Sequence, residues 1–363
     1  MPWERRKARG GVSLCKLSRL CLLAIFGIAA CICGEISCKN EGEPQLAFVS
    51  RRDGDTEIYI MNSDGSRQLP LTVNKEWDGD LAWSPDGKRI AFVSVLAGIR
   101  GIEVMNADGT RKIRLTTGPS ESFSPAWSPD GTKIAYMDSG TGNIDLYVMN
   151  ADGGNKRRLT NDPGIDAAPR WAPDGKRITF VRSWEGEQEI SDRLEIWIMR
   201  SDGAEQTRAT HNVAFDGLPA WSPDGGKIAF ESQRDGNFEI YVMKSDGSGQ
   251  TNLTRNADED RGATWSPDGR KIVFERGRPR DIYVVNADGT GEVNLTRNPA
   301  WDFVPQWSPD GRRIGFVRVV PGPGDSPHGG DEEIYVMDAD GSHVIRLTHV
   351  LGVDYAPLWR PAR

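Results

Sequence analysis

The pentapeptide Trp-Ser-Pro-Asp-Gly recurs through most of the chain at a nearly constant spacing. Copies begin at Trp83, Trp127, Trp221, Trp265 and Trp307; the copy at Trp171 has Ala172 in place of serine, and a truncated copy begins at Trp359. The seven tryptophans are separated by 44, 44, 50, 44, 42 and 52 residues. This period is typical of a four-stranded β-propeller blade, which takes roughly 40–50 residues.

A second pattern, a short apolar strand followed by an Asp-Gly turn, occurs once in each unit. The strands begin at Ile58, Ile102, Leu146, Ile196, Ile240, Ile282 and Ile334, and the turns at Asp64, Asp108, Asp152, Asp202, Asp246, Asp288 and Asp340. Glycine suits such turns because it accepts a positive φ. No segment has a sustained 3.6-residue apolar period, so we expect few helices. The two patterns predict an all-β fold over residues 45–363, a seven-bladed β-propeller of four-stranded antiparallel blades.

The two ends of the repeat complement each other. The first unit begins at Leu46 without a preceding tryptophan strand, and the last ends at Trp359 without a following apolar strand. An open array would leave unpaired strand edges at both ends. We therefore expect residues 355–359 to pair beside residues 46–50, so that a C-terminal strand completes blade one and closes the ring.

Residues 1–30 have the pattern of a bacterial lipoprotein signal peptide. A segment with six basic residues precedes an uncharged, largely apolar stretch from Leu20 to Cys33, which is too short to span a bilayer comfortably. Ile28-Ala29-Ala30-Cys31 resembles a lipobox, which predicts lipidation of Cys31 and a linker over residues 31–44. An ordinary signal peptide and an uncleaved N-terminal anchor are the alternatives.

Charge and cysteine content limit the classes of partner. All five cysteines lie at or before Cys38, so the propeller region has no disulfide. Removing residues 1–30 takes away a net charge of +5 and changes the formal charge from −7 to −12. So acidic a protein does not suit nucleic-acid binding, which needs a basic face. We expect a monomer that meets the membrane through its N-terminal lipid.

The repeated Trp-Ser-Pro-Asp-Gly and Ile-Tyr-Val-Met motifs resemble those of the TolB-type β-propeller family over residues 45–363. The resemblance implies the propeller fold and a place in the bacterial cell envelope. The chain departs from TolB in two respects: seven blades are expected rather than six, and the segment between Cys31 and Leu46 has no room for TolB's N-terminal α/β domain. TolB's role in envelope integrity is therefore not carried over.

An aspartate lies five residues before the tryptophan in six of the seven units, with Ser122 in the remaining one. The aspartates are Asp78, Asp166, Asp216, Asp260, Asp302 and Asp354. They lead into the innermost strands, so we expect them to surround one mouth of the central channel. Two carboxylates ~10 Å apart repel by roughly 1.7 kcal/mol at an effective dielectric constant of ~20. Three kinds of group would balance this charge: backbone N–H groups if each aspartate closes an Asx-type turn, a divalent cation, or a basic partner.

The same face carries the other candidate ligand contacts. Two insertions, Ser183–Arg193 and Val319–Asp331, fall on it, and loops on a rigid scaffold commonly bind ligands. Trp184, Trp301, His211 and His328 lie in its loops. The repeat tryptophans, in contrast, are expected to pack between blades.

An acidic residue also precedes the apolar strand in six units. The residues are Glu57, Asp145, Glu195, Glu239, Asp281 and Glu333. We expect them to face solvent or to pair with basic residues of the preceding hairpins, such as Arg52 and Arg234.

No sequence motif for catalysis is present. The four histidines have no metal-ligand spacing, and the chain has no Gly-x-Ser-x-Gly motif. The leading hypothesis is a non-enzymatic, lipid-anchored propeller of the cell envelope that binds a protein or a glycan without a cofactor. The alternatives are a periplasmic or surface lyase or hydrolase, with its site at the aspartate-ringed mouth, and a structural subunit of an envelope complex.

Overall fold

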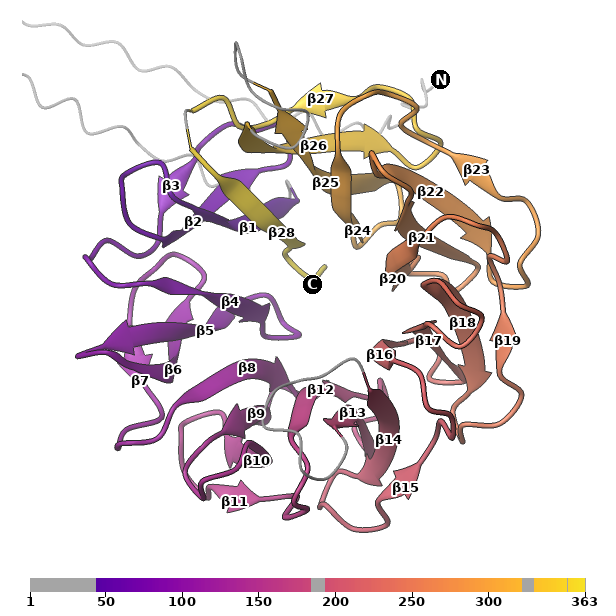
Figure 1. The fold of residues 1–363 in the computed structure, drawn as a ribbon. Coiled ribbons are helices and arrows are strands. Elements are labelled where there is room, and N and C mark those ends of the chain that lie inside the picture. Colours follow the sequence, from indigo (N-terminus) through magenta and orange to yellow (C-terminus); the bar gives the residue numbers. More distant parts are fainter. Residues whose placement is uncertain (1–43, 184–192, 322–329, 351, 363) are drawn as a thin grey trace, which may run out of the picture. The chain divides into compact units, whose positions relative to one another are not determined.

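The computed structural model describes residues 44–183, 193–321, 330–350 and 352–362, and all their regular secondary structure is β-strand. The strands form seven four-stranded antiparallel sheets that follow one another around a central axis as the blades of a propeller (Figure 1). The predicted all-β fold and its seven blades are therefore confirmed. The segments 1–43, 184–192 and 322–329, with residues 351 and 363, lie outside this description.

Each blade runs from an inner strand beside the axis to a short outer strand. Blade 1 contains β28 (Asp354–Trp359), β1 (Gln45–Ser50), β2 (Glu57–Asn62) and β3 (Leu69–Pro70). Blade 2 contains β4 (Asp78–Trp83), β5 (Arg89–Leu96), β6 (Ile99–Asn106) and β7 (Ile113–Arg114). Blade 3 contains β8 (Ser122–Trp127), β9 (Lys133–Asp138), β10 (Asp145–Asn150) and β11 (Arg157–Arg158). Blade 4 contains β12 (Asp166–Trp171), β13 (Arg177–Ser183), β14 (Leu194–Arg200) and β15 (Thr207–Arg208).

The other three blades repeat this order. Blade 5 contains β16 (Asp216–Trp221), β17 (Lys227–Ser232), β18 (Glu239–Lys244) and β19 (Thr251–Asn252). Blade 6 contains β20 (Asp260–Trp265), β21 (Lys271–Arg276), β22 (Asp281–Asn286) and β23 (Val293–Asn294). Blade 7 contains β24 (Asp302–Trp307), β25 (Arg313–Val320), β26 (Asp331–Asp338) and β27 (Ile345–Arg346).

Blade 1 takes its strands from both ends of the repeat, as predicted. β28 is the inner strand and pairs with β1, with Leu46 opposite Trp359 and Ser50 opposite Asp354. In Figure 1 the C-terminal β28 lies directly beside β1. This pairing gives the last tryptophan strand a partner and closes the ring.

The Trp-Ser-Pro-Asp-Gly motif forms the tight turn between the first and second strands. In the copy that follows Trp83, the Ser84 hydroxyl donates to Asp86 and accepts the N–H of Arg89. Gly87 has a φ of +62°, a conformation that glycine adopts without steric cost. The serine and aspartate therefore fix the geometry of the turn, and the glycine allows it.

The repeat tryptophans join neighbouring blades, as expected. The indole N–H of Trp127 donates to the carbonyl of Ala82 in the preceding blade, and Trp359 donates likewise to Gln306. Five of the seven indoles make this backbone bond without competition, and Trp221 shares its N–H between a carbonyl and the Thr179 hydroxyl. The indole nitrogen of Trp307 is buried without a partner. The tryptophans thus hold the ring together rather than facing a ligand.

Every inner strand contains a β-bulge at its third residue, which has a positive φ. The residues concerned are Asp80, Ser124, Ala168, Leu218, Gly262, Val304 and Ala356. The register shift of each inner strand falls at this point. The bulge twists the strand beside the channel and turns successive residues in different directions. It therefore decides which side chains reach the channel and which lie inside the blade.

Candidate functional site at the channel mouth

One face of the ring, called here the mouth face, carries the loops between blades and the hairpins that join the second and third strands. The hairpins of blades 4 and 7 contain the two predicted insertions, and their strands β13, β14, β25 and β26 are seven or eight residues long. β5 and β6 in blade 2 are equally long without any insertion. Ala97 and Gly98 both have positive φ at the tip of that hairpin, so a tight turn lets the strands pair to the end.

The structure places the six predicted aspartates inside the blades rather than at an exposed rim. Each begins an inner strand, and none is more than 1% exposed. Their carboxylates are therefore not presented to the channel. The ring of free charge expected from the sequence is absent from the part of the chain that the structure describes, because each carboxylate has been buried with partners of its own.

Arginine supplies most of the compensating charge. Arg182 binds Asp166 with two hydrogen bonds of 2.6 and 2.9 Å, and Arg276 binds Asp260 with the same geometry. The other pairs are Arg318 with Asp302, Arg234 with Asp216 and Arg52 with Asp354. Each arginine comes from the end of the second strand of the same blade or from the hairpin after it. Burial alone would lower the pKa of Arg276, but its hydrogen bonds to Asp260 and Glu292 raise that pKa above its ordinary value.

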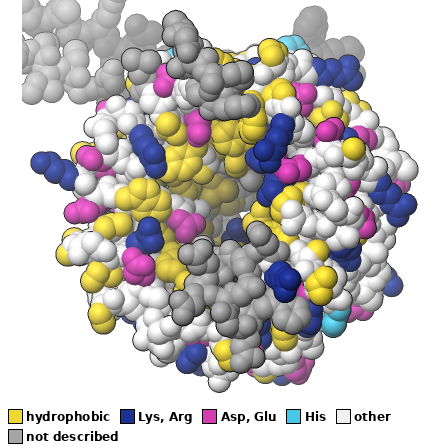
Figure 2. All heavy atoms as spheres, viewed as in Figure 1, with side chains coloured by type: hydrophobic (Ala, Val, Ile, Leu, Met, Phe, Trp, Pro, Cys, Tyr) yellow, Lys and Arg dark blue, Asp and Glu magenta, His cyan; other side chains and the backbone are white. Residues whose placement is uncertain are grey.

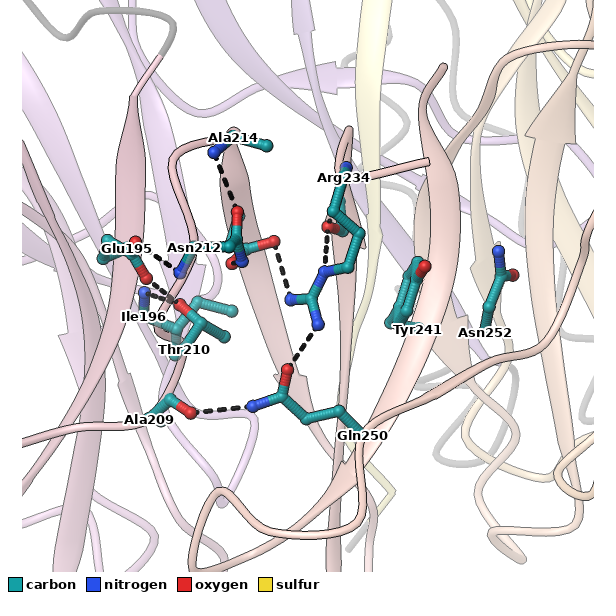
Figure 3. Close-up of polar contacts among 12 residues, drawn as sticks. Glu195, Ile196, Ala209, Thr210, Asn212, Ala214, Arg234, Tyr241, Gln250 and Asn252 are labelled. Atoms are coloured by element: carbon teal, nitrogen blue, oxygen red, sulfur yellow. Dashed lines mark hydrogen bonds and ion pairs between the residues drawn. The ribbon is translucent and has the colours of Figure 1, made fainter. Parts of the chain in front are cut away.

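Aromatic rings and outer-strand amides complete these networks. The Arg234 guanidinium lies 4.6 Å from the Tyr241 ring centroid and donates to Gln250, whose amide reaches the carbonyl of Ala209 in the preceding blade (Figure 3). Arg52, Arg182, Arg276 and Arg318 also lie over aromatic rings. Such a planar cation, stacked and bonded in two directions, is well suited to buried pairing. The networks therefore stabilise the blades and hold the carboxylates of these five aspartates on arginine.

The expected Asx-type turns are present, but an asparagine closes them. The side-chain oxygen of Asn212 accepts the N–H of Ala214, and its amide donates to Asp216 (Figure 3). Asn74, Asn256 and Asn298 form the same pair of contacts in their loops. The aspartate thus accepts a hydrogen bond from the asparagine, and the asparagine closes the turn.

The expectation for the acidic residues before the third strands is wrong. Five of them are at most 4% exposed: Glu57, Asp145, Glu195, Glu239 and Glu333. Arg52 and Arg234 pair instead with Asp354 and Asp216. Glu195 accepts from the Thr210 hydroxyl, the Asn212 N–H and Arg208 of the outer strand β15. Thr210, which follows the outer strand, therefore anchors the loop on a buried carboxylate, which the linear spacing does not reveal.

The remaining predicted contacts are only partly described. Trp301 is half-buried at the start of β24, with the Arg280 guanidinium 5.7 Å from its ring centroid. His211 is exposed in the loop between blades 4 and 5. Trp184, His328 and Cys31 lie outside the described residues.

Half-buried aromatic side chains stand at the starts of the inner strands. They are Trp77, Phe123, Phe215, Trp301, Phe303 and Tyr355, called here the aromatic collar. Two glycines make room for it: a Cβ on Gly79 would lie 2.7 Å from the Trp77 ring, and one on Gly217 would lie 2.5 Å from the Phe215 ring. Only Trp301 of the collar could be predicted from the sequence, because the members alternate between two positions, one before and one after the first residue of the inner strand.

Exposed aliphatic side chains extend the collar across the mouth face. Val73, Val213 and Val350 lie in interblade loops and Leu96 in the blade 2 hairpin, while Leu218 and Val304 occupy bulge positions in inner strands. Val213 is 76% exposed and Leu218 is 53% exposed. Figure 2 shows hydrophobic side chains gathered around the central opening, notably over β28, β1 and β4. Apolar surface concentrated in this way commonly marks a binding surface.

Two glutamates replace apolar residues in the second strands of blades 5 and 6. Glu231 and Glu275 occupy a second-strand position that holds valine or methionine in the other five blades. Glu231 accepts the bulge N–H of Gly262, and Glu275 accepts that of Val304 and a hydrogen bond from Arg280. Burial raises the pKa of Glu231 to about 7.

Two further features are absent from the described part of the chain. No three or more His, Cys, Asp or Glu side chains come together there in a way that would hold a metal ion. No helix there has the length and apolar character needed to cross a membrane.

Sequence comparison decides the family. The model of the TolB β-propeller domain matches residues 100–280, which span blades 2 to 6. This protein belongs to the TolB-type β-propeller family. The repeat that marks the family continues at both ends of the matched region, because blades 1 and 7 of this TolB-type propeller have the same strands and turns. No curated protein matches the sequence.

Solved structures share the fold. The putative TolB of Agrobacterium tumefaciens is 27% identical over 67% of this chain and 86% of that one, with a TM-score of 0.52. TolB of Acinetobacter baumannii is 21% identical over 88% of this chain and 83% of that one, with a TM-score of 0.56. An oligogalacturonate lyase in complex with manganese is 16% identical, covers 84% of this TolB-type propeller and 85% of its own chain, and has a TM-score of 0.62. At the last two identities the likeness shows the fold alone.

Proposed function

We propose that this chain is a non-enzymatic, lipid-anchored propeller of the cell envelope that binds a partner protein at the mouth face. One observation carries the binding role: the aromatic collar is surrounded by exposed aliphatic side chains on the face that bears the longest hairpins. Aromatic residues are enriched in the buried centres of protein interfaces. The aliphatic residues favour a protein over a glycan, because sugars are bound mainly through aromatic stacking and hydrogen bonds.

The alternative of a lyase or hydrolase required its active site at the aspartate ring of the channel mouth, and the burial of these aspartates argues against it. A lyase or hydrolase at the aspartate ring would need carboxylates within reach of substrate. Asp166, Asp260 and Asp302 are instead fully buried and each is bound bidentately by arginine. Binding without catalysis is therefore the function that these residues support better.

Negative charges placed on the mouth face test the binding role. Val213→Asp with Leu218→Asp changes two exposed side chains on that face, while Ile113→Asp with Val293→Asp changes two comparably exposed side chains on outer strands. Photocrosslinking in intact cells, with the reactive group placed at residue 73, should capture one specific envelope protein. We expect the mouth pair to abolish this capture and the outer-strand pair to leave it unchanged. Capture insensitive to the mouth pair, or glycan binding that the mouth pair abolishes, would refute a protein partner there.

The anchor is tested separately. Replacement of Cys31 by serine should abolish incorporation of labelled palmitate and release the protein from the membrane fraction. Cys33→Ser should leave both unchanged, because Cys33 lacks the aliphatic residue three positions earlier that Cys31 has in Ile28. Labelling that persists in the Cys31 variant would contradict the lipobox assignment.

A further inference from the structure

Six of the seven interblade loops lie between two acidic residues, one from each blade that the loop joins; the loop between blades 2 and 3 has Gly101 and Ser122 instead. The first acidic residue lies at the start of the third strand of one blade and the second begins the inner strand of the next, and in four of the loops one asparagine contacts both. In the loop between blades 4 and 5, the backbone N–H of Asn212 donates to Glu195 and its side-chain amide donates to Asp216. Two buried carboxylates held by one asparagine repel each other, and a nearby cation or protonation of one of them relieves this repulsion.

Arginine balances five of the six such pairs in the described chain. The outer strand supplies Arg158, Arg208 and Arg346 to the first carboxylate, and the hairpin region supplies Arg52, Arg182, Arg234, Arg276 and Arg318 to the second. The balanced pairs are Asp145 with Asp166, Glu195 with Asp216, Glu239 with Asp260, Asp281 with Asp302, and Glu333 with Asp354. Every one of them has at least one guanidinium.

Glu57 and Asp78, between blades 1 and 2, have no arginine. The outer-strand position opposite Tyr59, where Arg158, Arg208 and Arg346 stand in other blades, holds Pro70. The hairpin position two residues after Ser94, equivalent to Arg52 after Ser50, holds Leu96. Neither carboxylate forms an ion pair with any residue that the structure describes.

Each of these carboxylates also keeps one oxygen without a hydrogen-bond partner. Oε2 of Glu57 and Oδ1 of Asp78 are buried and unpartnered, and the side chains are 4% and 0% exposed. Asp145, Glu333 and Asp354 also keep one such oxygen, but each of these carboxylates has an arginine on its other oxygen. Asn74 holds the other two oxygens, its N–H donating to Glu57 and its amide to Asp78. Burial raises the pKa of Glu57, and the charge of Asp78 raises it further. The loop thus fixes two unbalanced carboxylates beside each other.

The side chains at this position carry oxygen atoms of the kind that hard cations prefer. Ser94 lies opposite Asp78 in the strand register, and its counterparts Ser50 and Ser232 each contact the arginine of their own blade. Carboxylate, amide and hydroxyl oxygens with water are the usual ligands of Ca²⁺. We propose that Glu57 and Asp78 bind a divalent cation, Ca²⁺ or one of the same oxygen chemistry, at the position where other blades place arginine.

Lys112 is the competing source of positive charge within the chain. This exposed lysine lowers the pKa of Glu57 from a distance, but it forms no ion pair with Glu57 or Asp78. Nor does it stand in the hairpin position of the absent arginine. Lys112→Met therefore separates the two explanations, because a bound cation does not depend on the lysine.

Calcium uptake by the purified full chain, in the absence of any partner, tests the site directly. Isothermal titration with CaCl₂ should find one site per chain with a dissociation constant of roughly 10⁻⁴–10⁻³ M, the range of extracellular calcium modules. Asp78→Asn and Glu57→Gln should each weaken binding at least tenfold. The matched variants Asp216→Asn and Glu195→Gln, at positions that already have arginine, should bind calcium as tightly as the wild type.

Thermal unfolding in EDTA shows whether each variant is folded when no calcium is bound. A loss of calcium binding can then be distinguished from a failure to fold. Asp78→Asn should leave Tm unchanged or raise it, because it removes unbalanced buried charge, whereas Asp216→Asn should lower Tm by stranding Arg234. Added calcium should raise the Tm of the wild type and of Lys112→Met but not of Asp78→Asn. Equal uptake by wild type and Asp78→Asn, no uptake at 10 mM (roughly ten times the weakest expected dissociation constant), or uptake only in Lys112→Met would overturn the proposal. None of these outcomes depends on a partner at the mouth face.

Discussion

Leu46 of β1 lies opposite Trp359 of β28, so residues from the two ends of the repeat are neighbours in one sheet. Both side chains are buried, and they belong to a core cluster that also contains residues of blade 7. The Trp359 indole N–H donates to Gln306 in that blade. The last strand therefore completes blade 1 and links it to blade 7 at once.

Removal of residues 354–363 should open the ring. The deletion would expose the edge of β1 and the cluster around Leu46, so we expect aggregation or a large loss of Tm. Trp359→Ala alone should cost on the order of 3–5 kcal/mol in the free energy of unfolding, measured with urea. Leu69→Ala is the control: that side chain is 56% exposed on an outer strand, and its change should stay within about 0.5 kcal/mol. A truncated chain with the wild-type melting curve would contradict closure by β28.

Two repeat tryptophans should respond differently to the same substitution. Trp127→Phe removes the donor to the Ala82 carbonyl and should cost about 1–3 kcal/mol beyond the loss of ring volume. Trp307→Phe removes an indole N–H that is buried without a partner, so only the volume term should remain. Urea denaturation of the two variants measures the difference directly. Equal costs would show that the indole hydrogen bond adds nothing to blade association.

The sequence predicted the blades and their closure because these depend on local, repeated signals. Trp-Ser-Pro-Asp-Gly specifies a turn, Ile-Tyr-Val-Met a buried strand, and the phase of the repeat determines the pairing of Leu46 with Trp359. The first two inferences used residues close together in the chain, and the third used the strand that each end of the repeat lacks. Repetition in seven units then made the pattern far stronger than one copy could be.

The interior of each blade could not be predicted in the same way. Asp166 and Arg182 are sixteen residues apart and meet only because β12 pairs with β13 in one register, with a bulge between them. The spacing of the aspartates can be read from the sequence. Their burial cannot, because it depends on the direction that the bulge gives each side chain. Likewise, Pro70 and Leu96 are seen to replace arginine only when the strand registers of the blades are compared.

Breaking one aspartate–arginine pair should be far costlier than its position near a loop suggests. Asp260→Asn leaves the buried Arg276 facing a neutral amide, and loss of one member of a buried pair typically costs about 3–5 kcal/mol. Glu292, which also binds Arg276, should hold the cost toward the lower end of that range. Asp86→Asn is the matched change at an exposed pair with Lys88 and should cost less than about 1 kcal/mol. Similar unfolding free energies for the two variants would mean that the buried pairs do not stabilise the blades.

Glu231 should make the stability of the propeller fall as pH rises. Burial raises its pKa from the ordinary 4.5 to about 7, and Gly262, Arg261, Glu275 and Arg280 are the groups around it. Between these two values the folded state binds more protons than the unfolded chain, so the unfolding free energy decreases with pH. The contribution is complete below pH 4.5 and is lost as pH passes 7, with an upper limit of about 3 kcal/mol.

Glu231→Gln should remove this slope, because a glutamine stays neutral at every pH. Urea unfolding between pH 5 and 8.5 should give the wild type an unfolding free energy that declines relative to that of the variant from pH 5 to about pH 7 and levels off above it. Glu231→Val, which installs the residue found at the same position in β5 and β13, should also abolish the slope. Glu76→Gln, at an exposed loop position, should retain it. A wild-type slope that survives in both Glu231 variants would assign the pH dependence to another group, since those variants leave nothing at this position to titrate.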